Sequence, residues 1–160
     1  MHTDNTVEMS GELDTIVRLA ADVERWPAIL PHYRWVTLLD GGGDHKVVEM
    51  AARRGRIPVR WRARQNIERS GPTPIIRYTH VWGVTKGMEV AWTFTRGPHS
   101  THVRIDHEWS PSWPLAGGLI SNHVIGPHFV GAIAGQTLDT IKAIVENRDA
   151  RFDVNGMPRS

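Results

Sequence analysis

The residues best suited to acid–base chemistry in this sequence are two histidines, His80 and His107, each within a run of alternating apolar residues. Alternation with a period of two predicts a β-strand with one buried and one exposed face. Both histidines fall on the apolar face, as do Tyr78 in the run of His80 and Gln65 in the preceding run. An imidazole titrates near neutral pH and can move a proton in enolisation or dehydration. The pair is therefore a candidate for proton transfer, and a hydrogen-bonded core histidine is the structural alternative for each.

The same runs place large aromatic rings beside these polar groups. Residues 56–67 alternate apolar side chains with Arg56, Arg60, Arg62 and Arg64. The runs 76–82, 88–94 and 103–109 repeat the alternation, and four tryptophans fall on the inner face: Trp61, Trp82, Trp92 and Trp109. We interpret these rings as the wall of a cavity for a flat or polyunsaturated ligand. Ordinary core packing is the alternative.

Tight turns between these runs would align the inner residues in rows across the sheet. The expected rows are Trp61, Trp82, Met88 and Trp109, then Ala63, His80, Val90 and His107, then Gln65, Tyr78 and Trp92. With strands about 4.8 Å apart, the backbones of the two histidines would be separated by about 10 Å. Both imidazoles could then reach one ligand. We expect a cavity in the few-hundred-Å³ range that is usual for small ligands.

The periodicities along the chain predict a single α+β domain over 1–160, with its core at 5–148 and a polar tail at 149–160. A short strand at 6–10 precedes two short helices, at 12–21 and between Asp22 and Pro31. Strands at 33–40 and 45–53 bring the sheet to about seven strands. Apolar residues spaced three and four apart then predict a long helix at 127–147. Such a helix buries its apolar stripe across the concave face of a curved antiparallel sheet.

Composition narrows the class of protein. With 40% hydrophobic and 22% charged residues, the chain has the composition of a soluble globular domain. No secretory signal or membrane-length apolar run is present, so the cytoplasm is the expected location. There is no cysteine, and the histidine spacings match no metal motif, so we expect neither a metal nor another cofactor. A net charge of only +2 without a groove-binding motif disfavours nucleic acid as a partner.

The segment 22–33 reads D-x-x-x-W-P-x-x-x-P-x-Y and resembles a segment of the START-like (SRPBCC) superfamily. Within that superfamily it is similar to the polyketide aromatase/cyclases and the coenzyme-Q-binding relatives, and residues 92–94 and 137–146 fit the same pattern. The resemblance implies a helix-grip fold. It also aligns Trp26, Tyr33, Trp61 and Trp92 with aromatic pocket positions, and His107 with a polar one. Because the superfamily holds cyclases, hydrolases, lipid carriers and hormone receptors, it implies a fold more than a chemistry.

One position departs from the cyclase pattern. By strand parity, the catalytic arginine that the resemblance implies falls at Gln65, whereas the neighbouring Arg64 should face outward. Glutamine cannot offer a fixed positive charge to an enolate. Either His80 or His107 therefore takes over the acid/base role, or the protein only binds its ligand.

The sequence leaves three hypotheses open. In the enzymatic one, a polyketide cyclase or aromatase, His107 or His80 moves a proton while Tyr33 and Gln65 orient carbonyl groups. Substrate contacts would come from Trp26, Trp61, Tyr78, Trp82, Trp92 and Trp109. A non-catalytic carrier of a lipid or quinone is the second hypothesis, and a ligand-sensing or structural module with a collapsed interior is the third.

For a carrier, the uncharged run 113–120 is either a membrane-contacting lip or a buried cover. The arginine face is either solvated or meets an acidic partner such as an acyl carrier protein, or an anionic membrane.

Overall fold

The computed structural model describes residues 1–110 and 127–150. The run 113–120 and most of the predicted tail lie outside these residues. In the described part of the chain, seven strands, three α-helices and one 3-10 helix follow one another: β1 (His2–Met9), α1 (Leu13–Ala21), η1 (Val23–Arg25), α2 (Trp26–Ile29), β2 (Tyr33–Gly42), β3 (His45–Arg54), β4 (Ile57–Glu68), β5 (Ile75–Gly83), β6 (Met88–Arg96), β7 (Thr101–Trp109) and α4 (Pro127–Ala150). The predicted α+β order is confirmed, although β1 begins at His2 rather than at residue 6.

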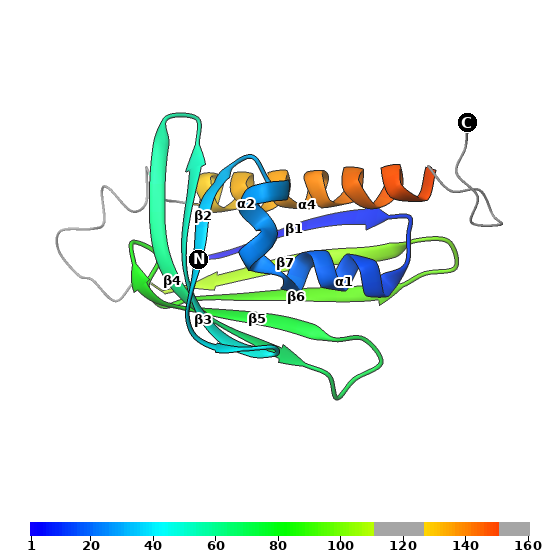
Figure 1. The fold of residues 1–160 in the computed structure, drawn as a ribbon, viewed down its shortest axis with the longest axis horizontal. Helices are drawn as coiled ribbons and strands as arrows, with labels where there is room; N and C mark the ends of the chain where they lie inside the picture. The colour runs from blue at the N-terminus through cyan, green and yellow to red at the C-terminus, as the bar shows by residue number, and fades with distance from the viewer. Residues whose placement is uncertain (111–126, 151–160) are drawn as a thin grey trace.

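The seven strands form one antiparallel sheet in the order β1-β7-β6-β5-β4-β3-β2. Strands that follow one another from β2 to β7 pair as neighbours. The first strand, β1, pairs with β7 at the edge of the sheet, with Thr3 opposite His107. Figure 1 shows the sheet curving beneath α4, which runs beside β1. This is the helix-grip arrangement predicted above.

One stripe of α4 attaches this helix to the sheet. Its buried side chains recur at steps of three and four residues: Phe129, Val130, Ala134, Thr137, Leu138, Ile141 and Val145. Polar contacts fix its position along β1, where Asn5 Nδ2 donates to Gly131 O at 3.0 Å and Lys142 Nζ donates to the Glu8 carbonyl at 2.6 Å. Buried apolar area supplies most of the attachment, at about 25 cal/mol per Å².

The parity predicted for β4 is confirmed. Trp61, Ala63 and Gln65 are buried, and Gln65 is fully enclosed, with 0% of its surface exposed. Arg60 and Arg64 face solvent on the other side of the strand. The inner position that the cyclase resemblance assigns to an arginine is therefore occupied by the glutamine.

The predicted inward orientation of Trp82 is wrong. A β-bulge in β5 places Trp82 opposite Arg62 and His80 opposite Ala63, so that Val81 is an extra residue in the ladder. One extra residue rotates the following side chain to the other face. Trp82 is 40% exposed on the outer surface, where the guanidinium carbons of Arg60 and Arg62 lie 5.0 and 4.9 Å from its ring centroid.

The predicted rows across β5 and β6 are also wrong by one inner position. Tyr78 pairs with Val90, and Ile76 pairs with Trp92, whereas tight turns would have put Tyr78 beside Trp92. The hydrogen bond from Gly87 N to His80 O, 2.8 Å long, spans the connection between these strands and shows that it is longer than a tight turn. The pairs Ala63 with His80 and Val90 with His107 agree with the prediction.

Gly83 permits the close approach of β5 to β4 just after the bulge. Its φ is +97°, and a Cβ there would lie 2.5 Å from Arg60 O and 2.9 Å from Trp61 Cα. Gly83→Ala should therefore lower the free energy of unfolding by about 2 kcal/mol or more in urea denaturation. Gly42→Ala is the matched control, because no atom lies within 4 Å of its Cβ position. Equal stability of the two variants would contradict this view of the bulge.

Candidate functional site

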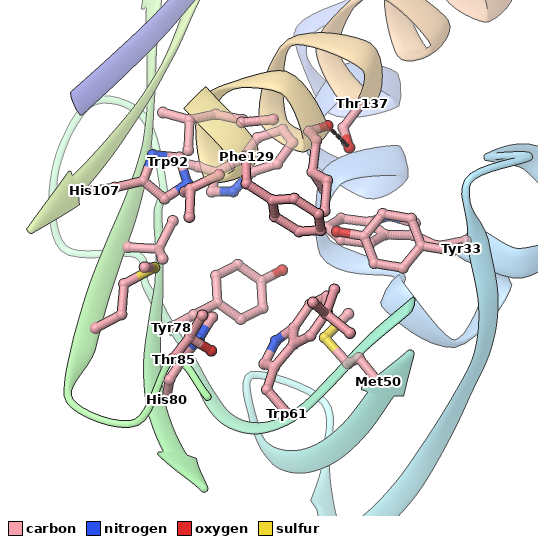
Figure 2. Close-up of a pocket in the computed structure, with 18 residues that line it drawn as sticks. Tyr33, Met50, Trp61, Tyr78, His80, Thr85, Trp92, His107, Phe129 and Thr137 are labelled. Atoms are coloured by element: carbon pink, nitrogen blue, oxygen red, sulfur yellow. Dashed lines mark hydrogen bonds between the residues drawn. The ribbon is translucent and has the colours of Figure 1, made fainter. Parts of the chain in front are cut away.

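A cavity of about 90 Å³ lies between the inner face of the sheet, α2 and the first turns of α4. It is smaller than the predicted few hundred Å³, because aromatic side chains occupy much of the space enclosed by the sheet. The described lining, drawn in Figure 2, consists of Trp26, Tyr33, Met50, Val59, Trp61, Tyr78, His80, Thr85, Met88, Val90, Trp92, Ile105, His107, Phe129, Val130, Ile133, Ala134 and Thr137. The lining is mainly apolar, with a few hydroxyl and imidazole groups.

Trp26 is the centre of the aromatic wall. Its ring centroid lies 4.9 Å from that of Tyr33, 6.0 Å from that of Trp92 and 6.5 Å from that of Tyr78. Its indole Nε1 donates to Leu19 O at 2.9 Å, which ties the wall to α1. Edge and tilted contacts at these distances are favourable between aromatic rings. The wall is therefore a fixed surface against which a flat ligand could pack.

His80 is held in place by two contacts. Its Nδ1 lies 2.7 Å from Thr85 Oγ1, and its ring stacks on Trp61 with 5.7 Å between centroids and 16° between planes. Burial, with a smaller contribution from His107, lowers the pKa of His80 to about 3. The side chain is thus an uncharged imidazole at neutral pH. Because Thr85 engages Nδ1, Nε2 is the nitrogen left for a ligand.

His107 is the second imidazole of the lining and is 5% exposed. Burial lowers its pKa to about 4, although the Thr3 backbone and the Asp106 carboxylate act in the opposite direction. Its Nδ1 is sealed from solvent and has no partner in normal hydrogen-bond geometry among the described residues. This imidazole therefore keeps one hydrogen-bonding nitrogen unused within the part of the chain that the structure describes.

Hydroxyl groups form the other polar part of the lining. Burial raises the pKa of Tyr33 well above its usual value, and burial together with Tyr33 does the same for Tyr78. The Tyr78 hydroxyl donates to Ala20 O and accepts from Gln65 Nε2, each at 3.3 Å. Tyr33 has its hydroxyl beside Thr137. Both phenols stay protonated, and the Tyr78 proton is already donated to Ala20 O.

Thr137 is oriented by His32 from outside the cavity. The Thr137 hydroxyl donates to Ile133 O at 2.8 Å, so it must accept from His32 Nε2, also at 2.8 Å. His32 is buried, and burial lowers its pKa. The sequence reasoning missed Thr85, Thr137 and His32. Of these three, only Thr137 could have been recognised from the sequence, because it is a polar residue within the apolar stripe of the last helix.

The structure brings together most of the predicted site residues but not all. His80, His107, Tyr33, Trp26, Trp61, Tyr78 and Trp92 line one cavity. Gln65 faces the interior but is absent from the described lining, because its amide nitrogen donates to Ala21 O at 2.8 Å. Trp109 is buried with its Nε1 donating to Lys86 O, and Trp82 lies on the outer face.

Buried neutral histidines make stability depend on pH. In the unfolded chain the His107 imidazole binds a proton below about pH 6.5, whereas in the folded protein it does so only near pH 4. Stability therefore falls as the pH drops through this window. Each such proton changes the free energy of unfolding by about 1.4 kcal/mol per pH unit. Urea denaturation between pH 6 and pH 4.5 should therefore show a falling stability, and His107→Gln should have a smaller slope. His99→Gln, at an exposed turn, is the control, and an unchanged slope in His107→Gln would contradict the assignment.

Other classes of site receive no support from the part of the chain that the structure describes. Within residues 1–110 and 127–150, no three His, Asp or Glu side chains gather in a way that could hold a metal ion. None of the described helices combines the length and the hydropathy that a membrane-spanning segment requires.

Comparisons with known proteins support this fold. A search of curated proteins finds no match. The structure is similar to a protein of Thermus thermophilus (TM-score 0.76, 17% identity, covering 92% of this chain and 99% of that one). It is also similar to the Zhui aromatase/cyclase of Streptomyces sp. R1128 (TM-score 0.73, 18% identity, 98% of each chain). A third relative is a STAR-related lipid transfer protein of Xanthomonas axonopodis (TM-score 0.66, 15% identity, 91% of this chain and 85% of that one).

The likeness to these structures concerns the fold, because each identity is below 20%. A family model adds a match at the level of sequence: residues 10–124 fit the family described as polyketide cyclase / dehydrase and lipid transport. This match spans most of the chain, from the turn before α1 past the last strand. The chain therefore belongs to the polyketide cyclase / dehydrase and lipid transport family.

Proposed function

We propose that this protein binds a hydrophobic, aromatic or polyketide-like molecule in the cavity and promotes its cyclisation and dehydration. The observation that carries the proposal is the meeting of two uncharged imidazoles, His80 and His107, with the Tyr33 hydroxyl around one ring-lined space. Membership of a cyclase and dehydrase family and a fold shared with an aromatase/cyclase support it. The fold similarity alone would not assign a reaction.

The reaction that suits these groups is an intramolecular aldol condensation. One imidazole takes a proton from a carbon between two carbonyl groups, while the Tyr33 hydroxyl donates a hydrogen bond to a carbonyl oxygen. The enolate carbon bonds to a second carbonyl carbon, whose oxygen receives a proton and becomes a hydroxyl. Loss of that hydroxyl with an adjacent proton releases water and leaves a double bond in the ring. General acid–base catalysis of this kind contributes about 10²- to 10⁴-fold.

The lowered imidazole pKa values set the conditions for such a step. Protonating His107 at pH 7 in the empty cavity, against a pKa of about 4, costs about 4 kcal/mol. An enolate that develops beside the ring offsets this cost, because an opposite charge nearby favours the imidazolium. The protonated form is then stabilised mainly in the transition state, which is the requirement for an increase in rate.

A non-catalytic carrier of a lipid or quinone is the second candidate. The aromatic wall around Trp26 and Trp92 would suit a flat ring, and the fold is shared with a STAR-related lipid transfer protein. In a carrier the two imidazoles would only donate or accept hydrogen bonds. The two candidates differ in whether a product is released.

For the protein partner we propose an acyl carrier protein. Residues 53–64 contain six arginines, and β3 and β4 carry them along the outer face and tip of one hairpin, where Glu49 is the carboxylate that pairs with Arg60 and Arg62. Trp82 adds an exposed apolar ring between two of the arginines. An acidic carrier protein complements such a surface. Arg60→Glu with Arg64→Glu should weaken its binding at least about tenfold, whereas Arg96→Glu, outside this hairpin, should not.

The function is tested by offering the purified protein a thioester of a linear poly-β-ketone and following the mass of the product. A cyclase should release a product that has lost water, faster than the spontaneous reaction. A carrier should retain the compound unchanged when the complex is weighed by native mass spectrometry. If the protein neither retains nor converts this compound or aromatic ring compounds, both candidates are contradicted.

A further inference from the structure

The described lining of the cavity contains no Asp, Glu, Lys or Arg side chain. Its titratable groups are two imidazoles and two phenols. Burial keeps His80 and His107 unprotonated and keeps Tyr33 and Tyr78 protonated, since it lowers the pKa of the first pair and raises that of the second. The space therefore offers hydrogen bonds and ring contacts without an ionic partner.

The nearby cations are directed elsewhere. Arg64 faces solvent on the outer side of β4, whereas its inward neighbour Gln65 donates to Ala21 O. Lys46 is buried, but it forms an ion pair with Glu24 and does not line the cavity. An anionic group that entered the described cavity would lose its hydration without gaining a counter-ion.

The polar groups of the lining lie at separate places. Figure 2 shows His107 and Tyr33 on opposite sides of the space, with Tyr78 between them and His80 beside Thr85. Beside Tyr33, the Thr137 hydroxyl already donates to Ile133 O, so it has only a lone pair to offer. A ring with an oxygen substituent can therefore pack against the wall and form a hydrogen bond at either end.

We infer that this cavity selects uncharged ring compounds that carry a hydroxyl or carbonyl oxygen and rejects the corresponding carboxylates. The inference rests on the proposed function, because it assumes that the cavity binds a ring-containing ligand. Burying an unpaired carboxylate has a penalty large enough to weaken binding by about 100-fold or more. A polyketide substrate would then have to enter with its acid end esterified, or leave that end outside.

Three para-substituted toluenes test the selectivity: 4-methylbenzamide, 4-methylbenzoate, which has the same shape as the amide, and the smaller 4-methylphenol. Calorimetric titration of the full chain at pH 7 should show binding of the amide and the phenol, with the carboxylate at least about 100-fold weaker. The amide is the decisive comparison, because it has the shape of the carboxylate without its charge. Equal affinity for the amide and the carboxylate, within about threefold, would overturn the inference and leave ligand binding intact. Failure of all three to bind would contradict the proposed function itself, and the inference with it.

A variant locates the preference in the cavity. His107→Phe should reduce the advantage of 4-methylphenol over toluene at least about fivefold, because one polar group of the lining is lost. His102→Phe, on the outer side of the same strand, is the matched control and should keep that advantage. Circular dichroism checks that both variants fold. An unchanged advantage in His107→Phe and in His80→Phe would show that the imidazoles do not select the ligand, and would overturn this part of the inference.

Discussion

Replacing His107 by alanine is expected to lower the turnover of a poly-β-ketone thioester by about 10²- to 10⁴-fold while changing its affinity only a few-fold. The reason is that an imidazole acting as an acid or base interacts most strongly with the transition state. His107 lines the cavity and is uncharged at neutral pH, so it is in the form that accepts a proton. The measurement is a single-turnover assay at saturating substrate, with affinity determined separately by titration.

The second imidazole and a control complete this experiment. His80→Ala should have a similar or smaller effect, depending on which ring lies nearer the acidic carbon. His102→Ala is the control, since it removes an imidazole from the outer face of the same strand, where it contacts Glu8. If the double variant His80→Ala, His107→Ala turns over as fast as the wild type, the acid/base hypothesis is wrong. A carrier would show modest affinity changes and no product in any variant.

Trp26→Ala should be the most destabilising change in the cavity wall, lowering the free energy of unfolding by about 3–5 kcal/mol. Trp26 is 3% exposed and contacts three other aromatic rings, so its truncation leaves a large void. It also leaves the Leu19 carbonyl without its indole donor. Urea denaturation at pH 7 measures the loss, and Trp26→Phe should recover part of it.

A tryptophan on the opposite face of the sheet provides the matched comparison. Trp82→Ala removes the same side chain from an exposed position, where its contacts are two arginine guanidinium groups. We expect a loss within about 1 kcal/mol. Similar losses in the two variants would contradict the assignment of Trp26 to the core and Trp82 to the surface.

The alternation of residues within a strand is a local property, and it predicted the features of the site that depend on one strand alone. Gln65 is buried and Arg64 exposed because successive side chains of β4 point to opposite faces. The inward position of His107 on β7 follows for the same reason. The apolar stripe of the last helix, with steps of three and four residues, likewise required a sheet to cover it. These patterns specified the helix-grip fold.

The features that differ from the sequence expectation depend on how two or more elements fit together. Trp82 was misplaced because the bulge at Val81 is a property of the ladder between β4 and β5, which alternation within one strand does not reveal. Tyr78 pairs with Val90 because the loop after β5 is longer than a tight turn, so the register moved by two residues.

The chemistry of the cavity combines both kinds of information. Alternation within each strand predicted which imidazoles and rings face inward, with Trp82 as the exception. Three contacts appear only in the folded protein: Thr85 engages His80, His32 orients Thr137, and the Gln65 amide bonds to Ala21 instead of lining the cavity. Each of these contacts joins residues from different elements, and so it exists only once the sheet, the short helices and α4 have packed. The lowered pKa values of His80 and His107 have the same origin, since burial arises from packing and is not encoded at either position alone.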